Sequence, residues 1–543
     1  MKIRPILASA AVLLQVAVGA HTMEATLPER PGAATVGVVA FANSGAPSAQ
    51  ADFLYGLAQL HNFQYQDAAA AFRRAQATDP DFALAYWGEA MSYNHPVWMQ
   101  QDASAARAAL IRLAPDRAAR LAKVGTERER SYLEAVDILY GEGGKFERDR
   151  RYAEAMQRLH ERWPGDVDGT AFYALSLLGT AHEGRDVPMY MKSYALLEEL
   201  FRQYPQHPGV AHYLIHSVDD AAHAPLGLNA ARAYGKIAPE SSHALHMTSH
   251  IYLALGMWDD VVAANESALA MGERRAAQRG VKPAACGHGQ IWLNYGYLQQ
   301  GRYADAKRMI AQCLAEVQTR PQFSESDQFD PDGSSLGAFY AMRLRYLLDA
   351  PPEAEVLGWT PEPGRVPYAA LLRDYGAAIL ATRRGAAEEF GTCAARARAS
   401  ATRLRAEMDR LEVDADSPYR RVLAIQLGQL DAAQRLLAGD RATGLSMLEA
   451  VARDEDALPA AFGPPQVDQP THELLGAMLA PSQASKVRTQ FERALALNPG
   501  RVDARRGLMQ AERTLGDAAA ADAIEAGLKK TLQRADAQAA GKF

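Results

Sequence analysis

Apolar and polar residues beyond residue 50 recur with the 3.6-residue period of amphipathic helices, and the chain lacks the alternating β-branched runs that are typical of strands. Between Arg320 and Pro367 the pattern breaks. The stretches "RPQFSESDQFDPDGSS" and "DAPPEAEVLGWTPEPGRVP" are dense in Pro, Gly and acidic residues, which favour irregular loops. From Tyr368 to about Ala452 long helical segments return. The pattern therefore predicts an all-α protein.

The helical segments repeat with a period of 34 residues. In "ADFLYGLAQLHNFQYQDAAAAFRRAQATDP" the small, aromatic and closing positions are Gly56, Ala68, Phe72, Ala75 and Pro80. Later units supply Tyr252, Gly256 and Ala268, then Leu293, Tyr297, Gly301 and Ala306, and finally Phe491, Ala494 and Pro499. These units resemble the tetratricopeptide-repeat family, and the resemblance covers most of residues 50–315 and 465–530. It implies a superhelical solenoid of helical hairpins, in one or two blocks, and says little about function because such repeats serve many partners.

The repeat pattern divides the chain into six segments. We expect a signal peptide at 1–20, a flexible segment at 21–48, an N-terminal solenoid at 49–318, irregular loops at 319–367, atypical helical repeats at 368–460 and C-terminal repeats at 461–543. The blocks "AYWGEAMSYNHPVW" and "AHYLIHS" also resemble those of exported bacterial repeat proteins of unassigned function.

The first twenty residues carry the features of a signal peptide. Lys2 and Arg4 precede an apolar run from Ile6 to Val18, and Val18 and Ala20 are small residues suited to a cleavage site. The run is shorter than the ~20 residues of a membrane span. We therefore expect a soluble protein in the periplasm or outside the cell, cleaved near Ala20 and without stable membrane insertion. A retained membrane anchor is the alternative.

The net charge of −6 and the isoelectric point near 6.2 give no sign of the clustered cations that nucleic acid would require. We therefore expect no nucleic-acid partner.

Histidines are concentrated on single helix faces. "HALHMTSHIYLALGMW" carries His243, His246 and His250, and "AHYLIHSVDD" places His212 and His216 one repeat earlier, at the spacing of His246 and His250. The family resemblance implies that the second, fifth and ninth positions of the first helix of each hairpin face the concave groove. Aligning the units on Gly256 and Gly301 places all five histidines at these groove-facing positions, together with His288 in the next unit.

These residue types suit a transition metal. Histidines at i and i+4 form a natural bidentate pair, so we expect His212, His216, His246 and His250 to surround a common point, with His243 and His288 near its edge. Asp219 and Asp220 lie nearby and no thiol is in phase, which favours Zn, Cu or non-haem Fe. Ligand recognition without metal and a purely structural role remain open.

Three functions are compatible with this pattern. The first is an exported repeat protein that binds a protein, a peptide or a small molecule in a His-lined groove with a transition metal. The second is a metal-dependent enzyme, with the Asp219/Asp220 pair as a candidate base. The third is a metal-free interaction scaffold whose aromatic residues Trp87, Trp98, Trp292 and Tyr295 anchor a peptide.

The chain contains three cysteines, so at most one intramolecular disulfide can form. Cys286 precedes the first helix of its repeat and Cys313 lies near the end of the second, and antiparallel packing brings such ends together. We expect this pair to be bonded, the alternative being that Cys313 is a buried thiol. Cys393 would remain free.

Overall fold

The computed structural model describes residues 35–321, 333–351, 353–363 and 366–537. The expected signal peptide lies outside the described residues. The first half of the chain contains α1 (Gln50–His61), α2 (Tyr65–Thr78), α3 (Ala83–Met91), α4 (Ala103–Leu113), α5 (Arg117–Leu121), α6 (Glu127–Leu139), α7 (Lys145–Arg162), α8 (Val167–Leu178), α9 (Val187–Gln203), α10 (Pro208–Val218), α11 (Ala224–Ile237) and α12 (Ser242–Ala254). Short strands β1 (Asn94–His95) and β2 (Gln100–Gln101) pair antiparallel between α3 and α4.

Helical hairpins continue through the second half. It contains α13 (Trp258–Gln278), α14 (His288–Gln299), α15 (Tyr303–Thr319), α16 (Ser335–Asp349), α17 (Ala354–Gly358), α18 (Pro367–Arg384), α19 (Ala387–Arg410), α20 (Pro418–Leu437), α21 (Arg441–Asp456), α22 (Thr471–Met478), α23 (Ala484–Leu497), α24 (Val502–Leu515) and α25 (Ala518–Thr531). The expected all-α solenoid of tetratricopeptide-type hairpins is therefore the fold of this chain.

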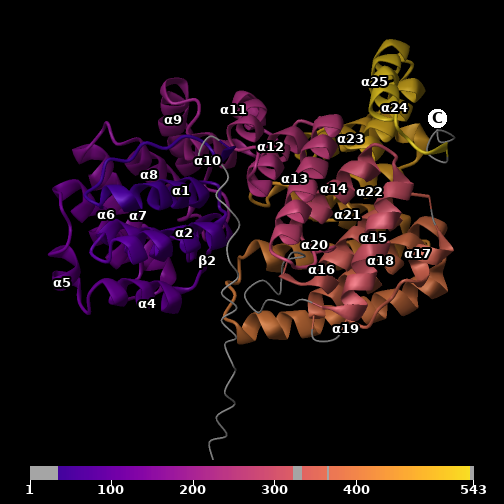
Figure 1. Cartoon of the computed structure of the whole chain (residues 1–543). Coiled ribbons are helices and arrows are strands. Elements are labelled where there is room, and N and C mark those ends of the chain that lie inside the picture. Colours follow the sequence, from indigo (N-terminus) through magenta and orange to yellow (C-terminus); the bar gives the residue numbers. More distant parts are fainter. Residues whose placement is uncertain (1–34, 322–332, 352, 364–365, 538–543) are drawn as a thin grey trace, which may run out of the picture.

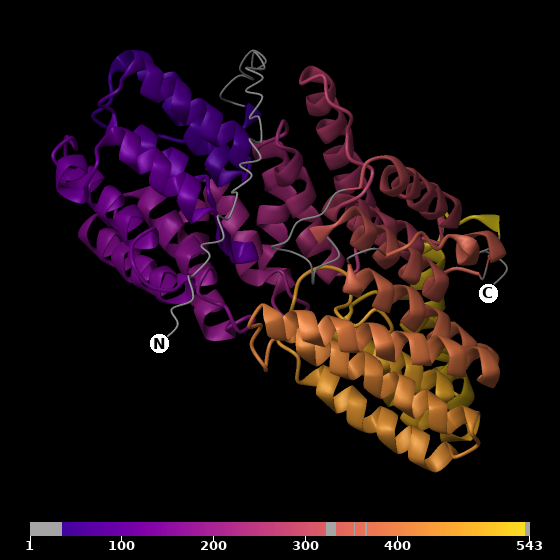
Figure 2. The same cartoon turned by 90° about the horizontal axis from the view of Figure 1, so that it is seen from below.

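The hairpins form two lobes that are joined by α10, α11 and α12. In Figure 1 the helices from α1 to α8 make the indigo-to-purple lobe, and the helices from α13 onwards make the other. Figure 2 shows the orange and gold C-terminal helices gathered on the side away from α1. One large apolar core runs from Phe41 to Ala254 and a second from Val262 to Leu479. The junction between the two cores therefore falls between α12 and α14.

Close packing explains the small residues of the repeat. Phe72 on α2 is fully buried, and a Cβ added at Gly88 on α3 would lie 2.4 Å from its ring. A Cβ at Gly56 on α1 would lie 3.1 Å from the same ring. The aromatic position of one helix is thus accommodated by glycines on its neighbours, which is why the repeat spacing predicts the hairpin packing.

Two segment assignments need correction. Residues 35–48 were expected to be flexible, but Val36 and Phe41 are buried, and Phe41 packs against Phe53 and Tyr132. Residues 319–367 were expected to be irregular, but they include α16, which is buried along its whole length. The Pro- and Gly-rich stretches flank this helix, so the breaker residues obscured a short apolar segment between them.

The C-terminal repeats turn back onto the middle of the solenoid. Gly256, in the turn after α12, has a φ of +67°, and a Cβ there would lie 2.7 Å from the Cα of Gly500. The indole N–H of Trp258 donates to the carbonyl of Gly500 at 2.9 Å. The amide of Val502 donates to the side chain of Gln299 on α14 at 2.9 Å. These contacts join parts of the chain more than 200 residues apart.

A buried ionic network anchors this return. Arg501 is 2% exposed and reaches Asp349 at the end of α16 at 2.7 Å and Glu473 on α22 at 2.5 Å. Burial raises the pKa of Glu473 to about 7, although Arg501 acts in the opposite direction. The guanidinium of Arg501, which directly precedes α24, therefore links this helix to α16 and α22.

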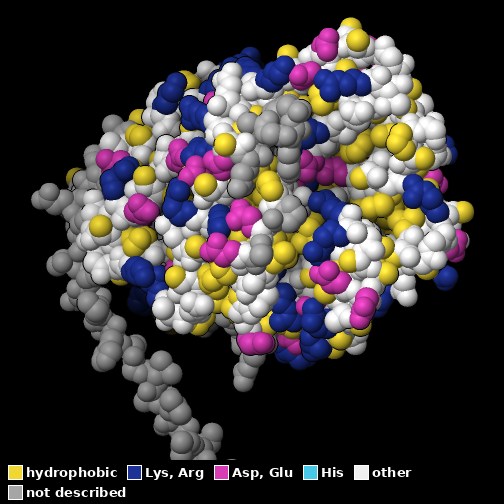
Figure 3. Space-filling model, turned by 90° about the vertical axis from the view of Figure 1, so that its right-hand side faces the viewer, with side chains coloured by type: hydrophobic (Ala, Val, Ile, Leu, Met, Phe, Trp, Pro, Cys, Tyr) yellow, Lys and Arg dark blue, Asp and Glu magenta, His cyan; other side chains and the backbone are white. Residues whose placement is uncertain are grey.

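The remaining sequence expectations concern the disulfide and the surface. Cys286 and Cys313 are joined by a disulfide, and Cys393 is free and buried. On the face that Figure 3 shows, cationic and anionic side chains are interspersed without a continuous basic patch. None of the described helices combines the length and apolar character of a membrane span.

Removing Asp349 is expected to destabilise the protein strongly. Asp349→Ala leaves Arg501 buried with one partner fewer, a change that costs about 3–5 kcal/mol in the free energy of unfolding. Urea denaturation followed by circular dichroism measures this loss. Asp431→Ala is the control, because its ion pair with Arg398 is exposed and is worth at most about 1 kcal/mol. Equal losses in the two variants would contradict the anchoring role.

Candidate metal centre

Three helices that open successive hairpins bring six histidines together. Helix α10 begins at Pro208, where the missing N–H costs nothing. The hydroxyl of Ser241 accepts from the amide of Ala244 and caps α12. Helix α14 starts directly at His288. The histidines are His212 and His216 on α10, His243, His246 and His250 on α12, and His288 on α14.

The six side chains form two sets of three. The ligand atoms of His212, His216 and His243 all lie within 4.8 Å of one another, and so do those of His246, His250 and His288. We call these sets triad A and triad B. Each consists of an i,i+4 pair and one histidine from the next first helix. The expected convergence of the two i,i+4 pairs is confirmed, since the rings of His216 and His250 have centroids 5.3 Å apart. His243 and His288, which were expected at the edge, instead complete two adjacent sets of three.

Oxygen acceptors fix the two rings of α12. The Nδ1 of His246 lies 2.6 Å from the side-chain oxygen of Asn265, whose amide nitrogen donates to the carbonyl of Val261. The Nδ1 of His250 lies 2.8 Å from a carboxylate oxygen of Asp219. Because these oxygens can only accept, each Nδ1 carries the hydrogen. In the neutral rings both Nε2 atoms are then unprotonated.

The two Nε2 atoms that result face each other. Nε2 of His246 and Nε2 of His250 are 3.3 Å apart with no hydrogen between them. Two lone pairs at this distance repel each other, whereas a shared cation would be attracted by both. Two nitrogens bound to one ion at about 2.0–2.1 Å in tetrahedral geometry lie about 3.3–3.4 Å apart. The observed spacing therefore matches the separation that two nitrogen ligands of one tetrahedral ion would have.

The two histidines of α10 are also oriented through Nδ1, but the tautomer of His243, which faces His212, is not fixed by an oxygen acceptor among the described residues. The Nδ1 of His212 lies 2.7 Å from the carbonyl oxygen of His61, and its Nε2 lies 3.1 Å from Nε2 of His243. The Nδ1 of His216 faces Asp219 at 3.2 Å. Nε2 of His216 is buried and makes no hydrogen bond within the described residues. Hydrogen bonds that orient metal-ligating histidines in this way raise affinity and fix the tautomer.

Asp219 serves both triads. Its carboxylate faces His216 of triad A and His250 of triad B. Arg185 binds Asp219 and also Asp220, so one buried cation is shared by the two carboxylates. Arg185 and the two histidines hold the pKa of Asp219 well below its usual value despite burial. Asp219 is thus an orienting partner, and Asp220 faces Arg185 and His223 instead of the cluster.

The cluster is enclosed instead of lining an open groove. The exposed fractions are 0% for His212, 2% for His216, 5% for His246 and 2% for His250, and only His243 and His288 are half-buried. Phe63, after α1, packs against His212 at 4.3 Å between ring centroids. Phe462, from the return segment before α22, packs against His250 at 5.0 Å. Sequence reasoning missed both rings, because each lies far from the cluster in the chain.

Phe63 holds its place at a conformational cost. Its φ of +52° is in the left-handed region, which is uncommon for a bulky residue and is often found at functional sites.

Burial keeps the imidazoles neutral. Burial, reinforced by the neighbouring histidines, holds the pKa of His212, His243 and His246 well below the ordinary value. Burial lowers the pKa of His250 to about 4, although Asp219 acts in the opposite direction. Neutral imidazole is the form that binds metals.

The aromatic residues proposed as peptide anchors have different positions. Trp87 is 1% exposed in the N-terminal core and packs against Tyr132, so it cannot contact a ligand in a groove. Tyr295 is 1% exposed and contacts Trp258. Both expectations were wrong, because the repeat phase does not reveal which face a later segment covers. Trp292 and Trp98 do lie beside the histidine cluster. The ring centroids of Trp292 and His250 are 4.4 Å apart in a stacked arrangement, and those of Trp98 and His243 are 5.9 Å apart.

A neighbouring polar cluster, formed by His61, Asp168 and His207, satisfies its hydrogen-bonding groups internally. His61 lies 2.9 Å from Asp168 through Nε2 and 2.9 Å from the Tyr213 hydroxyl through Nδ1. His207 faces Asp168 at 3.3 Å and accepts from the amide of Val210. Both nitrogens of each ring have hydrogen-bond partners, whereas Nε2 of His216 in triad A has none within the described residues. The polar cluster fixes α1, and hence the carbonyl that orients His212.

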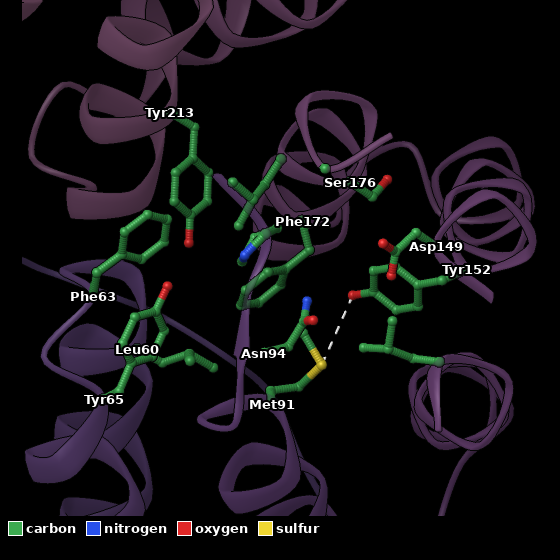
Figure 4. Close-up of a pocket in the computed structure, with 14 residues that line it drawn as sticks. Leu60, Phe63, Tyr65, Met91, Asn94, Asp149, Tyr152, Phe172, Ser176 and Tyr213 are labelled. Atoms are coloured by element: carbon green, nitrogen blue, oxygen red, sulfur yellow. Dashed lines mark hydrogen bonds between the residues drawn. The ribbon is translucent and has the colours of Figure 1, made fainter. Parts of the chain in front are cut away.

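An apolar cavity adjoins the triads. Figure 4 shows Phe63 and Tyr213 on one side of it and Asp149 and Tyr152 on the other. The cavity is small, with a free volume of about 20 Å³, which is room for about one water molecule. Phe63 and Tyr213 both line the cavity and both contact His212, so these two rings lie between the cavity and triad A.

No protein-family model matches the sequence, and no curated protein matches it. Among solved structures, the human IFIT1 dimer with m7Gppp-AAAA is 11% identical with a TM-score of 0.33, covering 91% of each chain. The APC/C hetero-tetramer Cut9-Hcn1 is 12% identical with a TM-score of 0.34, covering 87% of this chain and 78% of that one. Yeast Tom70 is 13% identical with a TM-score of 0.26, covering 91% and 96%. Likeness at this level carries no argument about the site.

The metal-free protein is expected to lose stability in mild acid. Unfolded histidines titrate near pH 6.5, whereas His250 and His61 in the fold titrate at about 4. Their depressed pKa values give stability that is present above about pH 6.5 and is lost as the pH falls towards 4. Asp168 and Asp219 act only at lower pH, because their unfolded pKa is about 3.9. Urea midpoints at pH 7.5, 5.5 and 4.5 measure the decline, and a flat profile would contradict the burial of neutral rings.

Proposed function

We propose that this chain is a transition-metal protein whose ligands are the six histidines of α10, α12 and α14. The observation that carries the proposal is the pair of facing Nε2 atoms of His246 and His250, 3.3 Å apart, with both Nδ1 atoms committed to oxygen acceptors. A metal ion turns this repulsive arrangement into two bonds. A purely structural cluster would instead be expected to pair its nitrogens, as His61 and His207 do.

The chemistry of the ligand atoms limits which metals suit the site. The six candidate ligands are imidazoles, and the nearby carboxylate of Asp219 is engaged by Arg185 and by the outer nitrogens of two of the rings. Imidazole suits Zn, Cu, Fe and Ni, whereas Mg, Ca and Mn prefer oxygen ligands. Zn, Cu or Fe therefore remains the expected cofactor or cargo.

The second candidate function is a metal-dependent enzyme that acts on a small apolar molecule. The cavity beside Phe63 favours it, because the cavity is lined mainly by apolar and aromatic side chains and adjoins triad A. A peptide anchored by Trp87 and Tyr295 has no support, since both side chains are buried.

We also propose that the protein is exported, with cleavage near Ala20. The N-terminal sequence supports this, and so does the disulfide between Cys286 and Cys313, since disulfides persist in oxidising compartments.

Replacing one histidine of each i,i+4 pair is expected to remove metal binding. In His212→Leu/His250→Leu each triad loses a ligand, while the apolar side chains of similar size keep the packing. Titration of the metal-free chain, made without a His tag, with Co²⁺, Zn²⁺ and Cu²⁺ should show an affinity at least 100-fold lower than that of the wild type.

His160→Leu is the matched control. His160 lies on α7 and contacts Thr170, so its loss leaves the triads intact and metal binding unchanged. A wild-type chain that binds none of the three metals, or a double variant that binds as tightly as the wild type, would refute the proposed function. Thermal unfolding followed by circular dichroism confirms that each variant is folded.

A further inference from the structure

The grouping of the histidines points to two metal ions instead of one. We propose that triads A and B each hold one copper ion and together form a dinuclear centre. This inference rests on the proposed function and deepens it.

The number of ligands exceeds what one ion uses. Protein metal sites built on histidine take three or four protein ligands, and six imidazoles converge here. Each triad by itself has the three nitrogens of an open metal site within 4.8 Å. Each also contains one Nε2 pair at ligand spacing, 3.1 Å between His212 and His243 and 3.3 Å between His246 and His250.

The triads are neighbours. The rings of His216 and His250, one from each triad, have centroids 5.3 Å apart, and His243 and His246 have centroids 6.3 Å apart. Asp219 contacts His216 and His250, so one carboxylate orients a ligand of each ion. Two-metal sites place their ions about 3.5–4 Å apart. The shared carboxylate and the adjacent rings are the arrangement that such a pair requires.

The charge of the enclosure favours copper. The candidate ligands are imidazoles, and Arg185 with the carboxylates of Asp219 and Asp220 sums to one negative charge, so two Cu(I) ions leave less excess charge in this buried site than two divalent ions would. Burying charge is costly, and Cu(I) carries half the charge of Zn²⁺ or Fe²⁺. Among divalent ions, Cu²⁺ also binds nitrogen sites most tightly. Copper therefore suits the triads in both oxidation states.

Three imidazoles leave each ion a free coordination position, which suits a small ligand between the two ions. The small ligand that we expect between the two ions is dioxygen. Each Cu(I) gives one electron, so two Cu(I) and O₂ become two Cu(II) and one bound peroxide, with no other reductant and no proton. Phe63, Trp292 and Phe462 surround the cluster and shield such an adduct from water.

Counting copper in matched variants tests the number of ions. His243 and His288 are half-buried, so His243→Ala and His288→Ala each remove one ligand from one triad with little effect on the core. The anaerobically Cu(I)-loaded wild-type chain, made without a His tag, should contain two copper ions. Each single variant should retain one, and His160→Ala should retain two.

The outcomes separate the two proposals. A wild-type chain that binds no metal would refute both, whereas saturation at one ion would refute the pair and leave the metal-binding function standing. Loss of both ions from either single variant would also refute two independent triads. Retention of Zn²⁺ against equimolar Cu²⁺ would refute the assignment to copper.

Exposure to oxygen tests the dinuclear chemistry. Air added to the Cu(I)-loaded wild type should produce a near-ultraviolet charge-transfer band of bound peroxide. The band should be absent from His243→Ala and His288→Ala, because one copper ion supplies only one electron. A band of equal strength in either variant, or no band in a wild type with two copper ions, would refute dioxygen binding between the ions.

Discussion

The structure of the site depends on where the histidine protons are. The Nδ1 hydrogens of His246 and His250 are donated outward to Asn265 and Asp219, so the inward nitrogens have lone pairs and no hydrogen. Burial keeps both rings neutral, because a charged imidazole in the enclosure would lack solvation. Such an arrangement is unfavourable by itself. A cation between the rings would remove the repulsion, so the outer hydrogen bonds are the feature on which the proposed metal binding depends.

Enclosure of the cluster requires the chain to return on itself. A solenoid stabilised only by contacts between neighbouring repeats leaves its concave face open. Here Arg501 ties the C-terminal repeats to α16, and the segment before α22 places Phe462 against His216 and His250. From the other lobe, Phe63 reaches His212. The two lobes therefore meet over the histidines, and the low pKa values of the rings follow from this long-range closure.

Local features of the fold and the site could be predicted from the sequence, and long-range ones could not. The 34-residue period placed His212 and His216 in register with His246 and His250, because repeat position and helix face are local properties. The division into triads depends on how far each helix is displaced along its neighbour, which no spacing encodes. Trp87 was wrongly assigned to a groove for a related reason: the residues that cover it, such as Phe41, belong to a segment without helical pattern.

The position of the triads would also make the proposed metal binding depend on the whole solenoid. His212 lies on a helix of the N-terminal apolar core, whereas His288 begins α14, whose apolar residues belong mainly to the second core. The helix between them, α12, contributes to both triads. Ions that bind only the folded arrangement stabilise it in proportion to their affinity. Occupied triads would therefore clamp the junction between two cores that are otherwise held by neighbour contacts and by the C-terminal return.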